Sequence, residues 1–541
     1  MKKLSVSVLL YFLISAALAQ QPVTLRPKLV VGIVVDQMRW DYLYRYYDKY
    51  AETGAFKRLL RQGFSCDNTM IPYIHTVTAC GHASIYTGTV PAIHGITGND
   101  WWDKTINDYQ YCTGDTLVKT VGSITAAAGA MSPRNLTVTT ICDELKLATN
   151  FKSKVIGIAL KDRGGILPAG HTADAAYWYD TKSGNWISST YYMKALPAWV
   201  NSFNAAKSVD SFYALGWKTL YPINTYTEST GDNMAYENRM FGNGFPYSLS
   251  QYAGKNYNVV VATPHGNTLT TRFAKAVINN EQMGADNITD FLAISYSTPD
   301  YVGHSFGPNS IEAEDIFIRL DKELGEFLDF LDAKIGNNQY LLFLTADHGA
   351  AQAPGFLNSY NIPAGHVQLQ QLQDTLNIKL KEKFGAADLI TVAANYQLVL
   401  NTYLVDSLKL NTTEVKQLAI KYALQQPGIK DAVDIATIMQ APLHNRIKEM
   451  IVNSYYAGRS GDIQLLYLPQ WVDDFEKGGT THGVWNPYDA HVPLLWYGWN
   501  IAPGKLSKEI NIIDIAPTLS SLLKIQMPSG CTGKPIAEII K

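Results

Sequence analysis

Cysteine and excess charge are both scarce in this sequence of 541 residues. The five cysteines leave at least one thiol unpaired, and their spacings match no CxxC zinc knuckle, so no disulfide framework is predicted. Lysine and arginine (45) nearly balance aspartate and glutamate (47), and the net charge is −2. This balance excludes a basic field for nucleic acid and a polybasic membrane patch. Beyond the N-terminus, no apolar run approaches the about 20 residues that a membrane-spanning helix needs.

The N-terminus has the pattern of a secretory signal peptide. Lys2 and Lys3 precede an apolar run at residues 4–18, which ends in Ala-Leu-Ala at 17–19, a small-x-small cleavage pattern. We therefore predict a signal peptide at 1–19, cleaved before Gln20. The alternative is an uncleaved membrane anchor, but the run is short for a span, and the lack of a cysteine at the cut disfavours a lipoprotein anchor. The mature protein is predicted to be soluble, and periplasmic or secreted.

The rest of the sequence alternates between buried-strand and helix patterns. Continuous apolar runs are typical of strands buried on both faces of a parallel sheet, and they occur at residues 29–35, 154–160, 291–295, 340–345 and 492–497. Apolar residues at three- and four-residue spacing predict a core-facing helix over 311–335. Asp514 and Pro517 indicate a further helix start. The alternation predicts an α/β fold with a mostly parallel central sheet flanked by helices.

Two stretches interrupt this alternation. Residues 164–257 are rich in Tyr, Trp, Asn and Ser and have weak periodicity. Residues 355–475 have a separate mixed α and β pattern, which includes a candidate helix at 415–424. We expect both stretches to be insertions in one catalytic domain at 20–541, where they form a cap or crown that shapes the cleft.

Acidic and histidine residues recur where the predicted buried strands end. In open α/β sheets, ligands bind at the carboxyl ends of the strands. A single Asp at such a place is often a turn former or a helix cap, and Asp-His doublets arise by chance. Here four separate clusters carry the same residue types, which favours a functional site. Its six potential ligands are Asp36, Asp300, His304, Asp347, His348 and His482.

Three carboxylates and three imidazoles are enough for two metal ions with three protein ligands each. Three-ligand sites leave a position open for substrate or water, as in catalytic zinc sites. Mixed Asp and His ligands suit zinc better than magnesium or calcium, which prefer oxygen. Two ions about 4 Å apart can stabilise the attacking and leaving oxygens of a phosphoryl displacement. The ligand pattern therefore predicts a two-metal catalytic site.

The nucleophile candidates lie in the small, polar segment 76–84. A hydroxyl at a helix N-terminus gains from the positive end of the helix dipole, and a metal ion would lower its pKa further. On these grounds Thr76, Thr78 and Ser84 all stay open. Cys80 is a better nucleophile by type, but a thiol beside zinc tends to become an inert ligand, so we interpret it as a small buried residue. Two nearby histidines are interpreted as supporting or structural: His75 and His82.

Seven short motifs together resemble the alkaline phosphatase superfamily. They are VDQMR at 35–39, TACGH at 78–82, SIYTG at 84–88, HGI at 94–96, DYVGH at 300–304, ADHG at 346–349 and THG at 481–483. Within the superfamily, the sequence is most similar to the phosphate-irrepressible, PafA-type alkaline phosphatases of bacteria. The resemblance extends from about residue 27 to Ile539, which is nearly all of the mature chain.

The resemblance implies a ligand set for each of two zinc ions and selects the nucleophile. One zinc ion is held by Asp300, His304 and His482. The second is held by Asp36, Asp347 and His348, next to Thr78, which is also a metal ligand. Thr78 occupies the nucleophile position that precedes Ala-x-Gly-His, and Cys80 falls at the variable position of that motif.

Three further residues match the groups with which this family contacts the phosphoryl group. By the resemblance, Asn99 donates a hydrogen bond to a phosphoryl oxygen, and Lys161 and Arg163 contact the non-transferred oxygens. A monoester dianion carries charge on three terminal oxygens, which two cations and a polar donor can neutralise in a loose transition state. A diester has an alkyl group at one of these oxygens and leaves a cation poorly paired. Without the family match, residues 161–163 would be interpreted as a solvated loop.

We therefore predict an alkaline phosphatase that hydrolyses small-molecule phosphate monoesters through a phospho-threonine intermediate at a two-zinc site. We expect a monomer with no membrane partner and no specific nucleic-acid partner. The nearest alternative is a nucleotide pyrophosphatase/phosphodiesterase of the same superfamily, which lacks the Lys161 and Arg163 pair. A sulfatase is disfavoured because no Cys/Ser-x-Pro-x-Arg segment is present to mature to formylglycine. From a different class, a catalytically inactive metal-containing binding protein is the other alternative.

Overall fold

A ten-stranded sheet forms the centre of the computed structural model, which describes residues 26–473 and 478–540. The strands follow the order β20-β2-β19-β11-β1-β10-β7-β8-β9-β6. In that order they span Gly504–Leu506, Phe64–Cys66, Leu494–Gly498, Tyr340–Thr345, Leu29–Val35, Asp290–Tyr296, Val155–Ala159, Ala175–Asp180, Asn185–Ser189 and Thr120–Val121. Neighbouring strands from β11 to β8 are parallel. The predicted α/β fold with a mostly parallel sheet is confirmed.

Four of the five predicted buried strands coincide with the middle of this sheet, and the fifth differs. β1, β7, β10 and β11 are buried along their whole length, as their apolar runs predict. The run at 492–497 is divided at Pro493, which has no N–H group to donate to a strand ladder. Before it, β18 (His491–Val492) pairs with β3 (Thr69–Met70) in a small separate sheet. After it, β19 runs antiparallel to β11.

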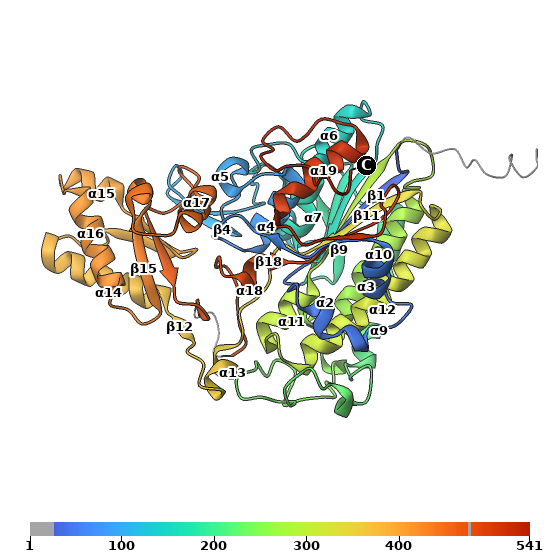
Figure 1. Ribbon diagram of the computed structural model, residues 1–541, viewed down its shortest axis with the longest axis horizontal. Helices are drawn as coiled ribbons and strands as arrows, with labels where there is room; N and C mark the ends of the chain where they lie inside the picture. Colours follow the sequence, from blue (N-terminus) through green and yellow to red (C-terminus); the bar gives the residue numbers. More distant parts are fainter. Residues whose placement is uncertain (1–25, 474–477, 541) are drawn as a thin grey trace, which may run out of the picture.

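Helices cover both faces of the sheet, as Figure 1 shows. One face carries α3 (Ala55–Gln62), α10 (Pro264–Asn280) and α12 (Ile311–Lys334). The opposite face carries α4 (Thr78–Thr87), α6 (Ile141–Ala148), α7 (Asp162–Ala169) and α19 (Ile515–Leu523). The helices predicted at 311–335 and after Asp514 are therefore present, as α12 and α19. The Ser310 hydroxyl caps α12 by accepting a hydrogen bond from the Ala313 N–H group.

The first interrupting stretch, residues 164–257, is only partly outside the sheet. Its strands β8 and β9 extend the central sheet. Their aromatic side chains pack into the core instead of alternating with polar ones: the Trp186 ring stacks on Phe273 of α10 at a centroid distance of 4.1 Å. The remainder contains α8 (Ala198–Ala205), α9 (Ser208–Leu215) and irregular chain.

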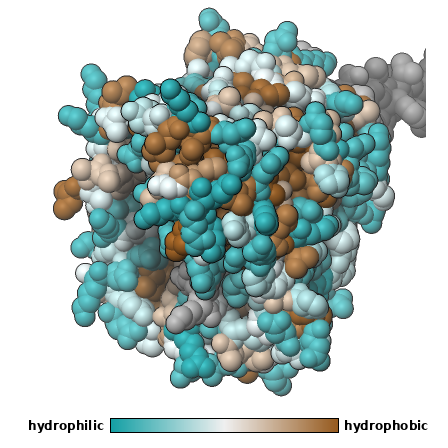
Figure 2. Space-filling model, turned by 90° about the vertical axis from the view of Figure 1, so that its left-hand side faces the viewer, coloured by the Kyte–Doolittle hydropathy of each residue, from teal (hydrophilic) through white to brown (hydrophobic). Residues whose placement is uncertain are grey.

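Residues 365–472, which we call the crown, have a sheet and a core of their own. Strands β13 (Ile390–Ala394), β14 (Gln397–Leu400), β16 (Ile463–Tyr467) and β15 (Ile429–Asp434) form an antiparallel sheet in that order. Its helices are α14 (Leu369–Phe384), α15 (Thr402–Ser407), α16 (Thr412–Ala423) and α17 (Asn445–Ser454). The crown lies to the left in Figure 1. Figure 2 views that end of the molecule and shows small groups of apolar side chains among hydrophilic ones.

Three observations concern the compartment. The predicted signal peptide at 1–19 lies outside the described residues. Within residues 26–473 and 478–540, no helix combines the length and apolar character that a membrane span requires. All five cysteines are free thiols, four of them buried.

Candidate active site

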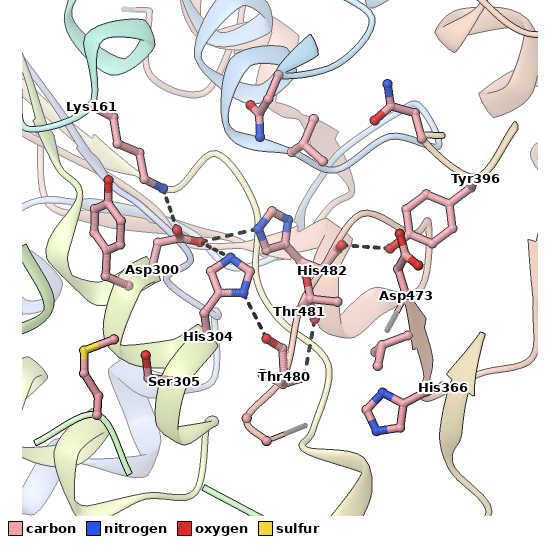
Figure 3. Close-up of a pocket in the computed structure, with 18 of the residues that line it drawn as sticks. Lys161, Asp300, His304, Ser305, His366, Tyr396, Asp473, Thr480, Thr481 and His482 are labelled. Atoms are coloured by element: carbon pink, nitrogen blue, oxygen red, sulfur yellow. Dashed lines mark hydrogen bonds and ion pairs between the residues drawn. The ribbon is translucent and has the colours of Figure 1, made fainter. Parts of the chain in front are cut away.

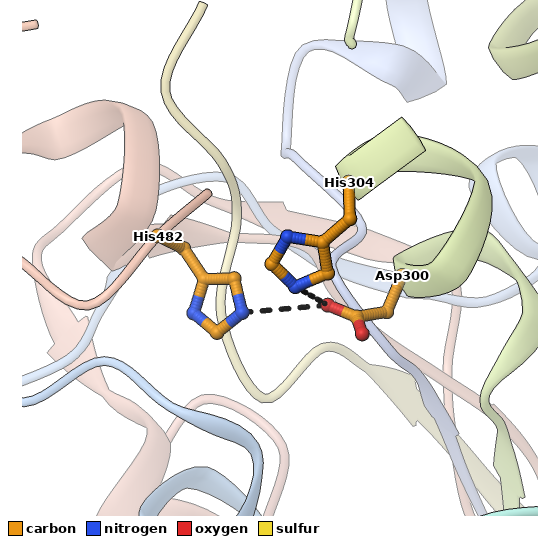
Figure 4. Close-up of side chains that lie close together, drawn as sticks. All are labelled: Asp300, His304 and His482. Atoms are coloured by element: carbon orange, nitrogen blue, oxygen red, sulfur yellow. Dashed lines mark ion pairs between the residues drawn. The ribbon is translucent and has the colours of Figure 1, made fainter. Parts of the chain in front are cut away.

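One group of candidate metal ligands consists of Asp300, His304 and His482. Asp300 and His304 lie one turn apart on α11 (Thr298–Phe306), which directly follows β10, so their side chains share one face of the helix. His482 comes from the segment after the crown. Its Nε2 atom lies 3.4 Å from Asp300 Oδ1, and His304 Nε2 lies 3.3 Å from the same oxygen (Figure 4). One ligand atom from each residue lies within 4.8 Å of the others, which is close enough to share a metal ion.

The second group consists of Asp36, Asp347 and His348, all of them fully buried. Asp36 follows β1 and Asp347 follows β11, and because these strands are neighbours and parallel, the two carboxylates meet at one edge of the sheet. His348 Nε2 lies 3.5 Å from Asp36 Oδ1 and 3.5 Å from Asp347 Oδ2. The His348 ring stacks on His482 at a centroid distance of 3.5 Å, so the two ligand groups adjoin.

Backbone carbonyl groups set the tautomer of all three histidines. His304 Nδ1 donates to Thr480 O (2.9 Å), His348 Nδ1 to Gly349 O (2.9 Å) and His482 Nδ1 to Thr76 O (2.7 Å). Each Nε2 atom is therefore left unprotonated in the neutral ring and directed at the carboxylates. Ligand histidines of metal centres are oriented by this kind of hydrogen bond.

The electrostatics of the two ligand groups favour a bound cation. Burial raises the pKa of Asp36 well above its ordinary value, and the Asp300 and Asp347 carboxylates raise it further. Burial lowers the pKa of His348 to about 3, so its ring is neutral, as a metal ligand must be. Asp36 Oδ1 and Asp347 Oδ2 are buried without a hydrogen-bond partner. Buried charged oxygens in this state are costly, and a divalent ion would compensate them. The residues present therefore fit a metal in both groups.

Thr78 lies where these groups meet. It is the first residue of α4. Its Oγ1 atom is 3.5 Å from His348 Nε2 and 3.4 Å from Lys161 Nζ. The positive end of the α4 dipole also favours negative charge at this hydroxyl.

The side chains of the other nucleophile candidates form hydrogen bonds to groups outside the two ligand groups. The Thr76 hydroxyl donates to Val484 O at 2.8 Å, and the Ser84 hydroxyl is 3.0 Å from His94 Nε2. Cys80 directs its thiol at Ile96 O, and burial raises the pKa of that thiol well above its ordinary value. The structure thus separates Thr78 from its neighbours, which the sequence pattern alone could not do.

The three candidate phosphoryl-binding residues line one cavity, and one of them, Lys161, contacts Thr78. Lys161 Nζ donates to Asp36 Oδ2 (2.6 Å) and to Asp300 Oδ2 (2.5 Å), one oxygen from each ligand group. Its side chain is 3% exposed, so residues 161–163 are not a solvated loop. Asn99 Oδ1 accepts a hydrogen bond from Ala79 N at 3.0 Å, and within residues 26–473 and 478–540 its Nδ2 group donates to no protein atom. Arg163 Nη1 donates to the Tyr111 hydroxyl at 3.1 Å.

A cavity of about 470 Å³ connects these residues to the first ligand group (Figure 3). Asn99, Lys161 and Arg163 line it together with the Asp300 group. Tyr396 of the crown lines another part of its wall and donates to His482 O at 2.9 Å. The cavity has room for an organic ester beside the group of Asp300, His304 and His482.

Several supporting residues were missed by the sequence analysis. Gln37 Nε2 donates to Asp300 Oδ1 at 2.7 Å, and Asp489 Oδ2 accepts from the N–H groups that follow His482. Tyr111 was missed as a partner of Arg163. His82, interpreted as supporting or structural, bonds to Thr78 O and Ser295. Only Gln37 has a sequence signal, because it directly follows Asp36.

A family model and several curated proteins match the chain. Residues 30–489 match the family described as type I phosphodiesterase/nucleotide pyrophosphatase. The chain is 50% identical over 519 residues to alkaline phosphatase PhoV of Synechococcus elongatus, an alignment that covers 95% of this chain and 93% of that protein. It is 48% identical over 520 residues to alkaline phosphatase PafA of Elizabethkingia meningoseptica, covering 95% of both.

Solved structures agree with these matches. The crystal structure of wild-type alkaline phosphatase PafA superimposes with a TM-score of 0.93 at 48% identity, covering 96% of this chain and all of that one. A PafA variant in which a threonine, an asparagine, a lysine and an arginine are replaced superimposes equally well, at 47% identity over the same share of both chains.

Proposed function

The chain belongs to the PafA- and PhoV-type alkaline phosphatases, within the type I phosphodiesterase/nucleotide pyrophosphatase family, and is a phosphoric monoester hydrolase; from this premise we propose that Thr78 is its nucleophile. The observation that carries the proposal is the position of Thr78 Oγ1, within 3.5 Å of both His348 Nε2 and Lys161 Nζ. The other hydroxyl and thiol groups of the segment are bonded away from this point.

The reaction has two displacements at phosphorus. Thr78 Oγ attacks the phosphorus atom, and the ester P–O bond breaks to release the alcohol. Water then attacks the phospho-threonine, and the Thr78 P–O bond breaks to release inorganic phosphate. Two divalent ions in the ligand groups would lower the pKa of both nucleophiles and stabilise the leaving oxygen.

The chain's own cations neutralise the transferring group. The Lys161 ammonium lies 3.4 Å from Thr78 Oγ1, so it is placed to contact phosphoryl oxygens as Thr78 attacks. Asn99 Nδ2 and the Arg163 guanidinium border the same cavity. Three donors match the three terminal oxygens of a monoester dianion, and charge stabilisation is the main catalytic demand of such transfers. The PafA variant supports these roles, because its four replaced residues have the same types and sequence spacings as Thr78, Asn99, Lys161 and Arg163.

The metal and the cellular setting complete the proposal. The donors suit zinc, since three imidazole nitrogens accompany the carboxylates. We further propose that residues 20–541 form one catalytic domain with insertions at about 164–257 and 355–475. A signal peptide exports this domain to the periplasm or beyond. The enzyme acts as a monomer on small-molecule phosphate monoesters.

A Thr78→Ala variant tests the nucleophile. On zinc-loaded enzyme, kcat/KM for an aryl phosphate should fall by orders of magnitude while the melting temperature stays within a few degrees. Thr87→Ala is the matched control, because Thr87 lies at the other end of α4 and donates to Ala83 O. Near-native activity of Thr78→Ala would reject the assignment.

The same enzyme separates the related activities. We expect the aryl phosphate to be preferred over its methyl ester and over an aryl sulfate, because Lys161 and Arg163 match a dianion. A preference for the methyl ester would identify a phosphodiesterase. Phosphate release together with bound zinc would exclude an inactive binding protein.

A further inference from the structure

The Tyr111 hydroxyl separates two charged side chains near the site. It donates to Asp162 Oδ1 at 2.7 Å and lies 3.1 Å from Arg163 Nη1, from which it accepts. A phenol has one proton and accepting lone pairs, so one hydroxyl can serve both neighbours. Asp162 Oδ1 also accepts from the Arg163 backbone N–H at 2.6 Å.

This arrangement keeps Arg163 from forming an ion pair. Among the described residues, no carboxylate oxygen lies within 4.0 Å of its guanidinium nitrogens, although Asp162 is its sequence neighbour. Arg163 Nε is buried without a hydrogen-bond partner. Arg163 thus lines the cavity without a carboxylate partner among the described residues, so that its donors are not occupied by the bidentate pair that Asp162 could form.

Tyr111 also connects Arg163 to Asn99. It is the last residue of β5 (Asp108–Tyr111), which pairs with β4 (Asp100–Asp103), so that Tyr111 lies opposite Asp100. The next residue, Cys112, donates its N–H to Asn99 O at 2.9 Å. One hairpin thus carries Asn99 at its start and the partner of Arg163 at its end.

We propose that Tyr111 is a positioning residue, which holds Arg163 toward the phosphoryl group and prevents its capture by Asp162, and that it thereby contributes to the preference for monoesters over diesters. The proposal rests on the proposed role of Arg163. A phenol suits this position because it fixes the guanidinium without neutralising it.

Tyr111→Phe removes the hydroxyl and keeps the ring. Loss of one hydrogen bond to a charged group is worth about tenfold in a binding equilibrium. We therefore expect about a tenfold fall in kcat/KM for an aryl phosphate, weaker inhibition by inorganic phosphate, and little change for the methyl diester. Tyr109→Phe is the matched control, since Tyr109 lies on the same strand, is 51% exposed and packs on Trp102.

A double-mutant cycle with Arg163→Ala decides the outcome. If Tyr111 acts through Arg163, Tyr111→Phe should have no further effect on the monoester when Arg163 is absent. An equal loss of monoester activity in both backgrounds would overturn the proposal. So would a Tyr111→Phe variant that keeps the wild-type ratio of monoester to diester activity although Arg163→Ala lowers that ratio. If Arg163→Ala itself leaves the ratio unchanged, the role of Arg163 fails instead.

Discussion

Gly81, the glycine of the Thr-Ala-x-Gly-His motif, allows two segments of the site to pack closely, and a Gly81→Ala variant tests this role. Gly81 lies one turn after Thr78, where α4 packs against the chain that leaves β11. A Cβ atom at Gly81 would lie 2.4 Å from Asp347 O, 2.5 Å from Asp347 Cβ and 2.7 Å from Asp347 Cα. Ordinary contacts begin at 3.4 Å, so α4 and Asp347 must separate by about 1 Å in a Gly81→Ala variant.

This shift should damage catalysis more than stability. Overpacking costs about 1–3 kcal/mol, but alanine in a helix recovers about 1 kcal/mol relative to glycine. A displacement of about 1 Å between reacting groups costs about 10²-fold in rate. Because Thr78 and Asp347 lie on the two sides of this contact, we expect Gly81→Ala to lose about 10²-fold in kcat/KM with a melting temperature only a few degrees lower.

The assay measures kcat/KM on zinc-loaded enzyme together with thermal unfolding. Gly231→Ala is the matched control, because a Cβ atom there meets only Met234 Sδ, at 3.8 Å. Activity of Gly81→Ala within threefold of wild type would refute the reasoning, since it would mean that the contact relaxes without moving Thr78. A large loss of stability with proportionate loss of activity would also refute it.

Two further variants test the surroundings of the site. Asp489→Ala removes the acceptor for the Gly483 and Val484 N–H groups, whose hydrogen bonds fix the chain after His482. The affinity for zinc, measured by competition with a chelator, should therefore fall about 10–100-fold. An unchanged dissociation constant for zinc would contradict this role of Asp489. Burial lowers the pKa of His94 to about 3 from its ordinary 6.5. Its contribution to stability is therefore complete above pH 6.5 and declines as the pH falls. The unfolding free energy of wild type relative to His94→Gln should drop by about 1.4 kcal/mol between pH 7.5 and 5.5, and a constant difference would contradict the buried neutral ring.

The parallel part of the fold was predictable because burial on both faces leaves a simple sequence signal. β1 is seven apolar or glycine residues in succession, a pattern typical of a strand buried on both faces of a parallel sheet. The Tyr- and Trp-rich β8 and β9 carry no such signal, because aromatic packing against α10 replaces alternation. Their place in the sheet depends on partners far away in the sequence.

The convergence of Asp36, Asp300 and Asp347 was predictable, because each follows a strand of the parallel sheet and the carboxyl ends of such strands meet at one edge, whereas His482 comes from irregular chain after the crown. The choice of Thr78 was not, because Thr76, Cys80 and Ser84 share its segment and differ only in what their side chains contact. The residues that hold the site in place through hydrogen bonds could not be predicted from the sequence either. Asp489 and Tyr111 form hydrogen bonds to residues whose proximity appears only once the chain has folded.

The crown forms hydrogen bonds to the segments that carry His482 and Asn99, which bears on its role. Tyr396 donates to His482 O at 2.9 Å, and its neighbour Asn395 donates to Asp100 O at 2.7 Å, next to Asn99. Arg459 Nη1 donates to Gly95 O at 2.6 Å, in the segment that leads to Asn99. A cap that only excluded water would not need to hold the backbone on either side of the cavity. These contacts instead make the crown part of the framework that holds the His482 segment and the Asn99 hairpin in place.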